Sequence, residues 1–89
     1  MRIEISPEVM FQDLDGEAIL LDLDKGFYYG LDSVGTRFWQ LLSAGSDLDD
    51  AVNQLLGQYA VDEETLRADL LRLLAELQAA GLVTLADTR

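Results

Sequence analysis

The residues from 26 to 33, Gly-Phe-Tyr-Tyr-Gly-Leu-Asp-Ser, constrain the fold more than any other part of this sequence. The aromatic residues Phe27, Tyr28 and Tyr29 favour an extended strand, because such side chains pack well on a pleated sheet. Asp32 or Ser33 then offers the side-chain oxygen that caps the start of a helix. The chain is therefore expected to change here from a β-rich front to a helical back.

Two tight turns divide the front part of the chain. An Asp-Gly pair at 15–16 predicts a two-residue hairpin turn, because glycine reaches positive φ without steric cost. Residues 24–26 form a second turn. The turns separate three expected strands over 9–14, 17–23 and 27–31. Such short connections give an antiparallel meander in chain order, which leaves the third strand at an edge of the sheet.

The third expected strand has two different faces and an open side. Alternation along the strand places Phe27, Tyr29 and Leu31 on the core face, and Tyr28 and Gly30 on the other. The strand holds no proline or charged residue that would block pairing at an exposed edge. Its backbone is therefore expected to be open to a further strand.

The back part of the chain predicts three helices. Apolar residues at helical spacing indicate a first helix over 34–44 and a second carrying the stripe from 48 to 59. Ser46 with Asp49 resembles a capping pair for the second helix. Asp62 is expected to cap the third helix, which ends at Gly81. Three helices with an appended three-stranded sheet indicate an α+β, winged helix-turn-helix-like fold with the sheet packed against the third helix.

The two ends of the chain are harder to place. The first eight residues are expected to form an unpaired lead-in, because Pro7 discourages regular pairing. Residues 82–85 form a short extended tail, for which two arrangements stay open. The tail either adds to the sheet or packs as a small wing.

Composition limits the chemistry of the chain. It holds no cysteine and no histidine, so thiol chemistry, histidine-dependent catalysis and ordinary zinc sites are not expected. Its 17 acidic and 6 basic residues give a net charge of −11, which would repel nucleic acid. No apolar run reaches about 18 residues, the length of a membrane span, and no secretion signal is recognisable. One cytoplasmic domain, residues 1–89, is expected, without nucleic-acid or membrane partners.

An alternative interpretation rests on Ser33. Acyl and peptidyl carrier proteins are small, acidic and helical, and they carry phosphopantetheine on a serine in an Asp-Ser-Leu-like motif at a helix start. Residues 30–34, Gly-Leu-Asp-Ser-Val, resemble that motif. Helix capping explains the same Asp32 and Ser33 without a cofactor. A carrier also places a long helix ahead of the serine, where this chain has turns and strands.

Several short motifs occur in a fixed order along most of the chain. They are residues 28–32 (Tyr-Tyr-Gly-Leu-Asp), Gly35, Trp39, Leu41-Leu42, Gly45-Ser46 and residues 81–83 (Gly-Leu-Val). This order resembles the PqqD family, whose pattern is an aromatic strand, Leu-Asn or Leu-Asp, a helix, a glycine-containing break, two more helices and a closing Gly-Leu-Val. Within that family, the chain is similar to the stand-alone leader-binding proteins of lasso-peptide biosynthesis.

The resemblance implies a recognition element that is not an enzyme and uses no cofactor or metal. Such a domain binds the leader of a ribosomally made precursor peptide. The leader adds as a strand to the third β-strand and lies against the third helix. The domain presents the precursor to modifying enzymes, which in the lasso pathway are a leader peptidase and a macrocyclase.

The resemblance also implies which residues bind the peptide. On the strand they are Phe27, Tyr28, Tyr29, Gly30 and Leu31. On the helix they are Leu66, Arg67, Leu70, Arg72, Leu73, Leu74 and Leu77. The two arginines are the basic residues of this helix, so they are expected to meet acidic groups of the leader. No catalytic residue is expected.

Overall fold

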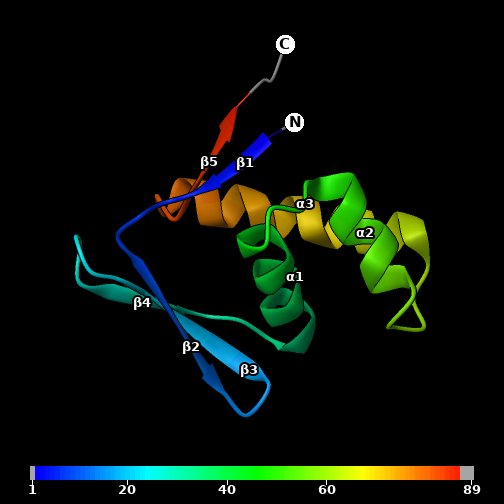
Figure 1. Ribbon diagram of the computed structural model, residues 1–89, viewed down its shortest axis with the longest axis horizontal. Helices are drawn as coiled ribbons and strands as arrows, with labels where there is room; N and C mark the ends of the chain where they lie inside the picture. Colours follow the sequence, from blue (N-terminus) through cyan, green and yellow to red (C-terminus); the bar gives the residue numbers. More distant parts are fainter. Residues whose placement is uncertain (1, 87–89) are drawn as a thin grey trace.

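The computed structural model describes residues 2–86, which form helices and strands in a mixed α+β arrangement (Figure 1). In chain order the elements are β1 (Arg2–Ile5), β2 (Val9–Leu14), β3 (Glu17–Asp22), β4 (Phe27–Gly30), α1 (Ser33–Ser43), α2 (Leu48–Leu56), α3 (Glu63–Ala79) and β5 (Val83–Ala86). Within residues 2–86, no helix has both the length and the apolar character needed to cross a lipid bilayer.

The three-stranded sheet is the meander that the two turns predict. β2, β3 and β4 pair antiparallel in chain order, and β3 and β4 each end one residue earlier than expected. Asp15 and Gly16 take φ values of 62° and 92°, the left-handed values that a tight two-residue hairpin requires. Among the described residues, β4 pairs with β3 on one side and with no strand on the other.

The two faces of this sheet follow the predicted alternation. Leu31 is buried, and Phe27 and Tyr29 pack against the edge of the core. Tyr28 and Gly30 lie on the opposite, outer face and are exposed. The core face of β4 was therefore predicted correctly from the period of two.

The two chain ends form a second sheet, so the expectation of an unpaired N-terminal lead-in is wrong. β1 pairs antiparallel with β5, with Ile3 opposite Leu85 and Ile5 opposite Val83 (Figure 1). Pro7 lies in the turn after β1 and therefore interrupts no pairing. The tail pairs with β1 and does not join the three-stranded sheet. Burial of these four apolar side chains in or against the core favours the pairing.

Each helix begins at an aspartate. The carboxylates of Asp32, Asp47 and Asp62 accept hydrogen bonds from the N–H group three residues further on, at 2.7, 2.9 and 3.0 Å. The expected caps at Asp32 and Asp62 are confirmed. The expected pair of Ser46 and Asp49 is wrong, because Asp47 is the cap and Asp49 lies within the first turn. Carboxylates at these positions also interact favourably with the positive end of the helix dipole.

Ala18 joins the sheet to the helices. Its C=O accepts a hydrogen bond from the Leu31 N–H at 2.8 Å, and its N–H donates to Oγ1 of Thr36, near the start of α1, at 2.8 Å. Thr36 is buried, so this hydroxyl oxygen supplies the partner that solvent cannot. The expected packing of the sheet against the third helix needs correction, because α1 lies directly against β3.

The Ala18–Thr36 hydrogen bond is expected to contribute measurably to stability. Thr36→Val keeps the shape of the side chain but leaves a buried N–H without an acceptor, which costs about 1–3 kcal/mol. Thr36→Ser keeps the acceptor and loses one methyl group, so it should cost about 1 kcal/mol or less. Urea denaturation measures both changes. A Thr36→Val protein with the unfolding free energy of the wild type would contradict this role.

Candidate functional site

The free edge of β4 presents backbone groups at two positions. In an antiparallel ladder, alternate residues exchange hydrogen bonds with the neighbouring strand, and the residues between them point the other way. The Leu31 N–H bonds to β3, so the backbone groups of Tyr29 and Phe27, two and four residues earlier, also point toward β3. The N–H and C=O groups of Tyr28 and Gly30 therefore point away from β3, where a further strand could pair with them.

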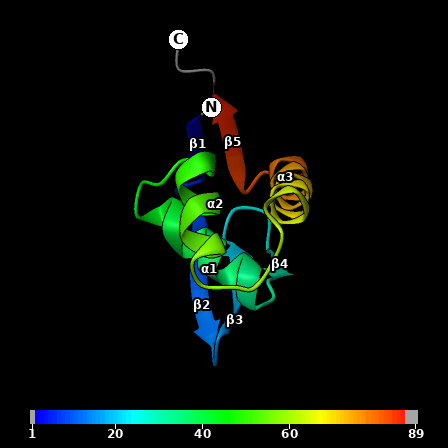
Figure 2. The same cartoon turned by 90° about the vertical axis from the view of Figure 1, so that its right-hand side faces the viewer.

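A groove of about 460 Å³ lies between β4, the start of α1 and α3. Figure 2 shows α3 nearly end-on with β4 below it on the same side of the molecule. Apolar side chains line the groove: Leu31, Val34, Val61, Leu66, Leu70 and Leu73. Its polar lining residues are Asp32, Thr65, Asp69, Arg72 and Glu76, and Tyr29, Gly30 and Gly35 complete it.

The groove has the length of a short extended peptide. Its wall on α3 runs from Thr65 to Glu76, a stretch of 12 residues joined by 11 steps along the helix. At a rise of about 1.5 Å per helical residue, this wall is about 16 Å long. An extended chain rises about 3.3 Å per residue, so about five residues can lie along it.

Gly35 lies near the start of α1, where it lines the groove. A Cβ atom at this position would lie 3.2 Å from Oδ1 of the capping Asp32 and 3.4 Å from the nearest methyl carbon of Leu73. The first distance is tight for a side-chain carbon, whereas the second is at the limit of ordinary van der Waals contact. The glycine therefore mainly leaves room for the capping carboxylate of Asp32.

The structure brings seven of the twelve residues expected to bind peptide to this groove. They are Tyr29, Gly30 and Leu31 from β4, and Leu66, Leu70, Arg72 and Leu73 from α3. The other five, Phe27, Tyr28, Arg67, Leu74 and Leu77, do not line it. Leu74 and Leu77 are buried in the core. Tyr28 still contributes its backbone to the open edge, and whether any of the twelve contacts a peptide stays a prediction.

Arg67 and Arg72 lie in different surroundings although they share one helix. Arg67 bonds to Asp49 of α2 at 2.8 Å, and this hydrogen bond raises the pKa of the guanidinium. Arg72 is a groove residue and pairs with Asp69, one turn away, at 3.1 Å. Exposed pairs of this kind contribute little stability, so Arg72 can exchange its partner for a group on a ligand.

Seven lining residues were missed in the sequence. They are Asp32, Val34, Gly35, Val61, Thr65, Asp69 and Glu76. The period of α3 could have found Asp69 and Glu76, because they lie within one turn of Leu66, Leu70 and Leu73 on the same face. Val61 carried no signal, since it belongs to the loop before α3.

Tyr29 connects β4 to α3 at one end of the groove. Its hydroxyl group donates a hydrogen bond to the Glu76 carboxylate. Burial of the ring, this hydrogen bond and the negative charges of Glu76 and Asp32 raise the pKa of Tyr29 from 10.0 to about 12. The phenol therefore stays neutral and remains a hydrogen-bond donor over the physiological range.

The groove offers the chemistry of binding. It combines an apolar floor, a few charged groups and the unshared N–H and C=O groups of an edge strand, which are what an extended peptide needs for recognition. Within residues 2–86, no group of three or more His, Cys, Asp or Glu side chains is arranged to hold a metal ion.

Known proteins resemble this chain over most of its length, including the elements that form the groove. The family model of coenzyme PQQ synthesis protein D (PqqD) matches residues 17–83, which contain β3, β4 and all three helices. No curated protein matches the chain. TbiB1 in complex with the TbiA(beta) leader peptide is 38% identical, with a TM-score of 0.88 over 94% of this chain and 99% of that chain. Lasso peptide synthetase B1 complexed with the leader peptide is 24% identical and shares the fold, with a TM-score of 0.85 over 96% of this chain and 100% of that chain.

The Tyr29–Glu76 contact should be visible in a pH titration. The unfolded chain releases the Tyr29 proton near pH 10 and the folded chain near pH 12, so the stability that this contact contributes is complete below pH 10 and is lost between pH 10 and 12. Phenolate absorbance should show one of the three tyrosines titrating late. Tyr29→Phe should remove that step, and Glu76→Gln should move it to lower pH. Three tyrosines that titrate together in the wild type would contradict the contact.

Proposed function

We propose that this chain, which belongs to the PqqD family, binds the leader segment of a ribosomally synthesised precursor peptide. The observation that carries the proposal is the open edge of β4 facing the groove on α3. The similarity to TbiB1, which was solved in complex with a leader peptide, supports it. The chain acts as a binding module and not as an enzyme.

Leader binding takes place by strand addition. The leader lies beside β4 and exchanges hydrogen bonds with the N–H and C=O groups of Tyr28 and Gly30. Every second leader side chain then points into the groove, toward apolar residues such as Leu70 and Leu73. The backbone bonds supply sequence-independent affinity, and the groove side chains select the leader.

The bound leader places the rest of the precursor before modifying enzymes. We place the chain in lasso-peptide biosynthesis, in the cytoplasm, where the enzymes are a leader peptidase and a macrocyclase. The similarity of the fold to lasso peptide synthetase B1 supports this placement. All 89 residues act in it as one peptide-recognition domain.

The fold supports a winged helix-turn-helix-like description, with α1 to α3 as the helices and the β1–β5 pair as a wing. This description carries no nucleic-acid function with it. A net charge of −11 opposes the phosphate contacts on which such binding depends.

The alternative carrier function has less support. Asp32 accepts the Gly35 N–H at 2.7 Å as the cap of α1, and Ser33 is the first residue of that helix. The motif thus has a structural role that needs no prosthetic group. The element before the serine is β4, where a carrier protein has a long helix.

Three variants test the proposed mode of binding. Tyr28→Pro removes an N–H that points away from β3, so it should spare the sheet but weaken leader binding at least about tenfold. Arg72→Glu, in the groove, should weaken binding about three- to tenfold. It replaces a positive charge, which is expected to meet acidic groups of the leader, with a negative charge that repels them. Arg67→Glu makes the same charge change outside the groove and should leave affinity unchanged.

The measurement is a titration of a fluorescent synthetic leader against each protein, with circular dichroism as the control for folding. Folded Tyr28→Pro and Arg72→Glu proteins that bind the leader as tightly as the wild type would place the binding site elsewhere.

A further inference from the structure

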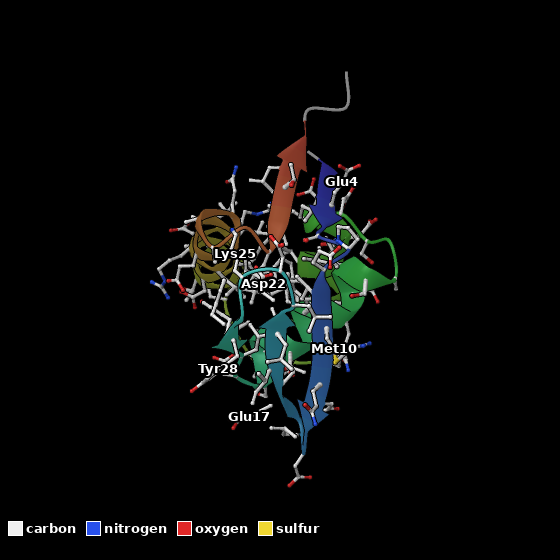
Figure 3. The ribbon with its side chains drawn as sticks, turned by 90° about the vertical axis from the view of Figure 1, so that its left-hand side faces the viewer. Glu4, Met10, Glu17, Asp22, Lys25 and Tyr28 are labelled. Atoms are coloured by element: carbon white, nitrogen blue, oxygen red, sulfur yellow. The ribbon has the colours of Figure 1, made fainter. Side chains whose placement is uncertain are left out.

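Tyr28 is the most exposed large apolar residue of residues 3–85, with 70% of its surface open to solvent. The register sets it opposite Leu21, which lies opposite Met10, so the three side chains form a row across β4, β3 and β2. Figure 3 looks onto this outer face of the sheet, with Met10 and Tyr28 on either side of β3. Among the described residues no strand follows β4, so the row ends at the ring of Tyr28.

A peptide that adds to β4 as a strand would continue this row. Residues that lie beside one another on neighbouring strands carry their side chains on the same face of a sheet. The peptide residue beside Tyr28 therefore places its side chain on the outer face, against the free side of the ring. The residues before and after it point to the opposite face, where the groove lies.

The other outward position of the peptide lies beside Gly30 and has a different neighbour. Gly30 is on the same face of β4 as Tyr28, two residues further along the strand. It has no side chain, so a peptide residue beside it meets no β4 side chain directly across the strand. The two outward positions are therefore unequal, because the one beside Tyr28 has a large ring to pack against and the one beside Gly30 has none.

An apolar side chain fits the position beside Tyr28. It covers ring surface that is exposed in the free protein, and aromatic or β-branched residues make favourable cross-strand pairs with an aromatic ring. A carboxylate at this position would be repelled by a chain whose net charge is −11. The backbone bonds of β4 can be made by almost any peptide, whereas this contact depends on the identity of one peptide residue.

We propose that the ring of Tyr28 selects an apolar side chain, best an aromatic or β-branched one, at one outward-facing position of the leader. The inference rests on the proposed function and adds a second selecting contact to it. The groove selects the leader residues that point inward, and Tyr28 selects one residue that points outward. Because inward and outward residues alternate, the leader then carries apolar residues at adjacent positions and not only at every second one.

The test selects a displayed library of random peptides on the wild type and on three variants, with circular dichroism as the control for folding. Tyr28→Thr removes the ring but keeps the backbone N–H and a strand-favouring residue. Tyr28→Phe keeps the ring. Met10→Thr makes a matched change at the other end of the row, on β2, which is about 14 Å from a strand added to β4.

Peptides enriched on the wild type should share an apolar residue at one outward position, and this preference should disappear only on Tyr28→Thr. In titrations, the most enriched peptide should bind Tyr28→Thr about three- to tenfold more weakly than the wild type, and the other two variants within about twofold. Alanine at the outward position of the peptide should weaken binding to the wild type by a similar factor. The same alanine should change binding to Tyr28→Thr less than about twofold, because the partner ring is already absent.

A second measurement needs no variant, because the ring protons of Tyr28 should show NOEs to the outward peptide side chain in the wild-type complex. Absence of these NOEs, or a Tyr28→Thr that enriches the same peptides with wild-type affinity, would overturn the inference. Enrichment of lysine or arginine at the outward position would also overturn it, since the ring would then select a cation. These outcomes leave peptide binding intact, whereas a wild type that enriches no peptide would contradict the proposed function.

Discussion

The arrangement of the groove depends on the backbone of one residue, Ala18. Its C=O accepts a hydrogen bond from the N–H of Leu31, where the chain leaves β4. Its N–H donates a hydrogen bond to Oγ1 of Thr36, near the start of α1. Both hydrogen bonds measure 2.8 Å, and the second lies in the buried interior, where an unmade bond would be costly. Together they fix where the sheet ends and the helices begin. The edge of β4 that faces away from β3 is thereby placed beside the helices, and among the described residues it pairs with no strand.

The acidic character of the chain has several separate structural uses. Asp32, Asp47 and Asp62 begin the helices, and the buried Asp22 carboxylate accepts the backbone N–H groups of the turn after β3 at 2.9 and 3.0 Å. Glu76 orients the Tyr29 hydroxyl across one end of the groove. A strongly negative composition opposes the phosphate contacts on which nucleic-acid binding depends, and these five carboxylates also serve the fold.

Local patterns in the sequence predicted the elements well and their tertiary relations less well. The meander and the stripes of α1 to α3 follow from periods of 2 and 3.6, which neighbouring residues carry. The pairing of β1 with β5 joins the two ends of the chain, and no local pattern encodes which distant strand will be the partner. The helix that covers the sheet was misassigned for the same reason, because the Ala18–Thr36 contact depends on tertiary packing. In the groove, the strand and the leucines were found from pattern. The orientation of α3 places Arg72 in the groove and Arg67 outside it, beside Asp49. Sequence alone does not give this orientation, so the two arginines could not be told apart.

Residue-resolved amide hydrogen exchange shows whether a leader peptide adds to β4 as a strand. In the free protein, the amides of Tyr28 and Gly30 should exchange fast and that of Tyr29 slowly, because the inward residue is already bonded to β3. On saturation with leader peptide, exchange at Tyr28 and Gly30 should slow to the rate of Tyr29. A leader that binds while both outward amides keep their fast exchange would contradict strand addition.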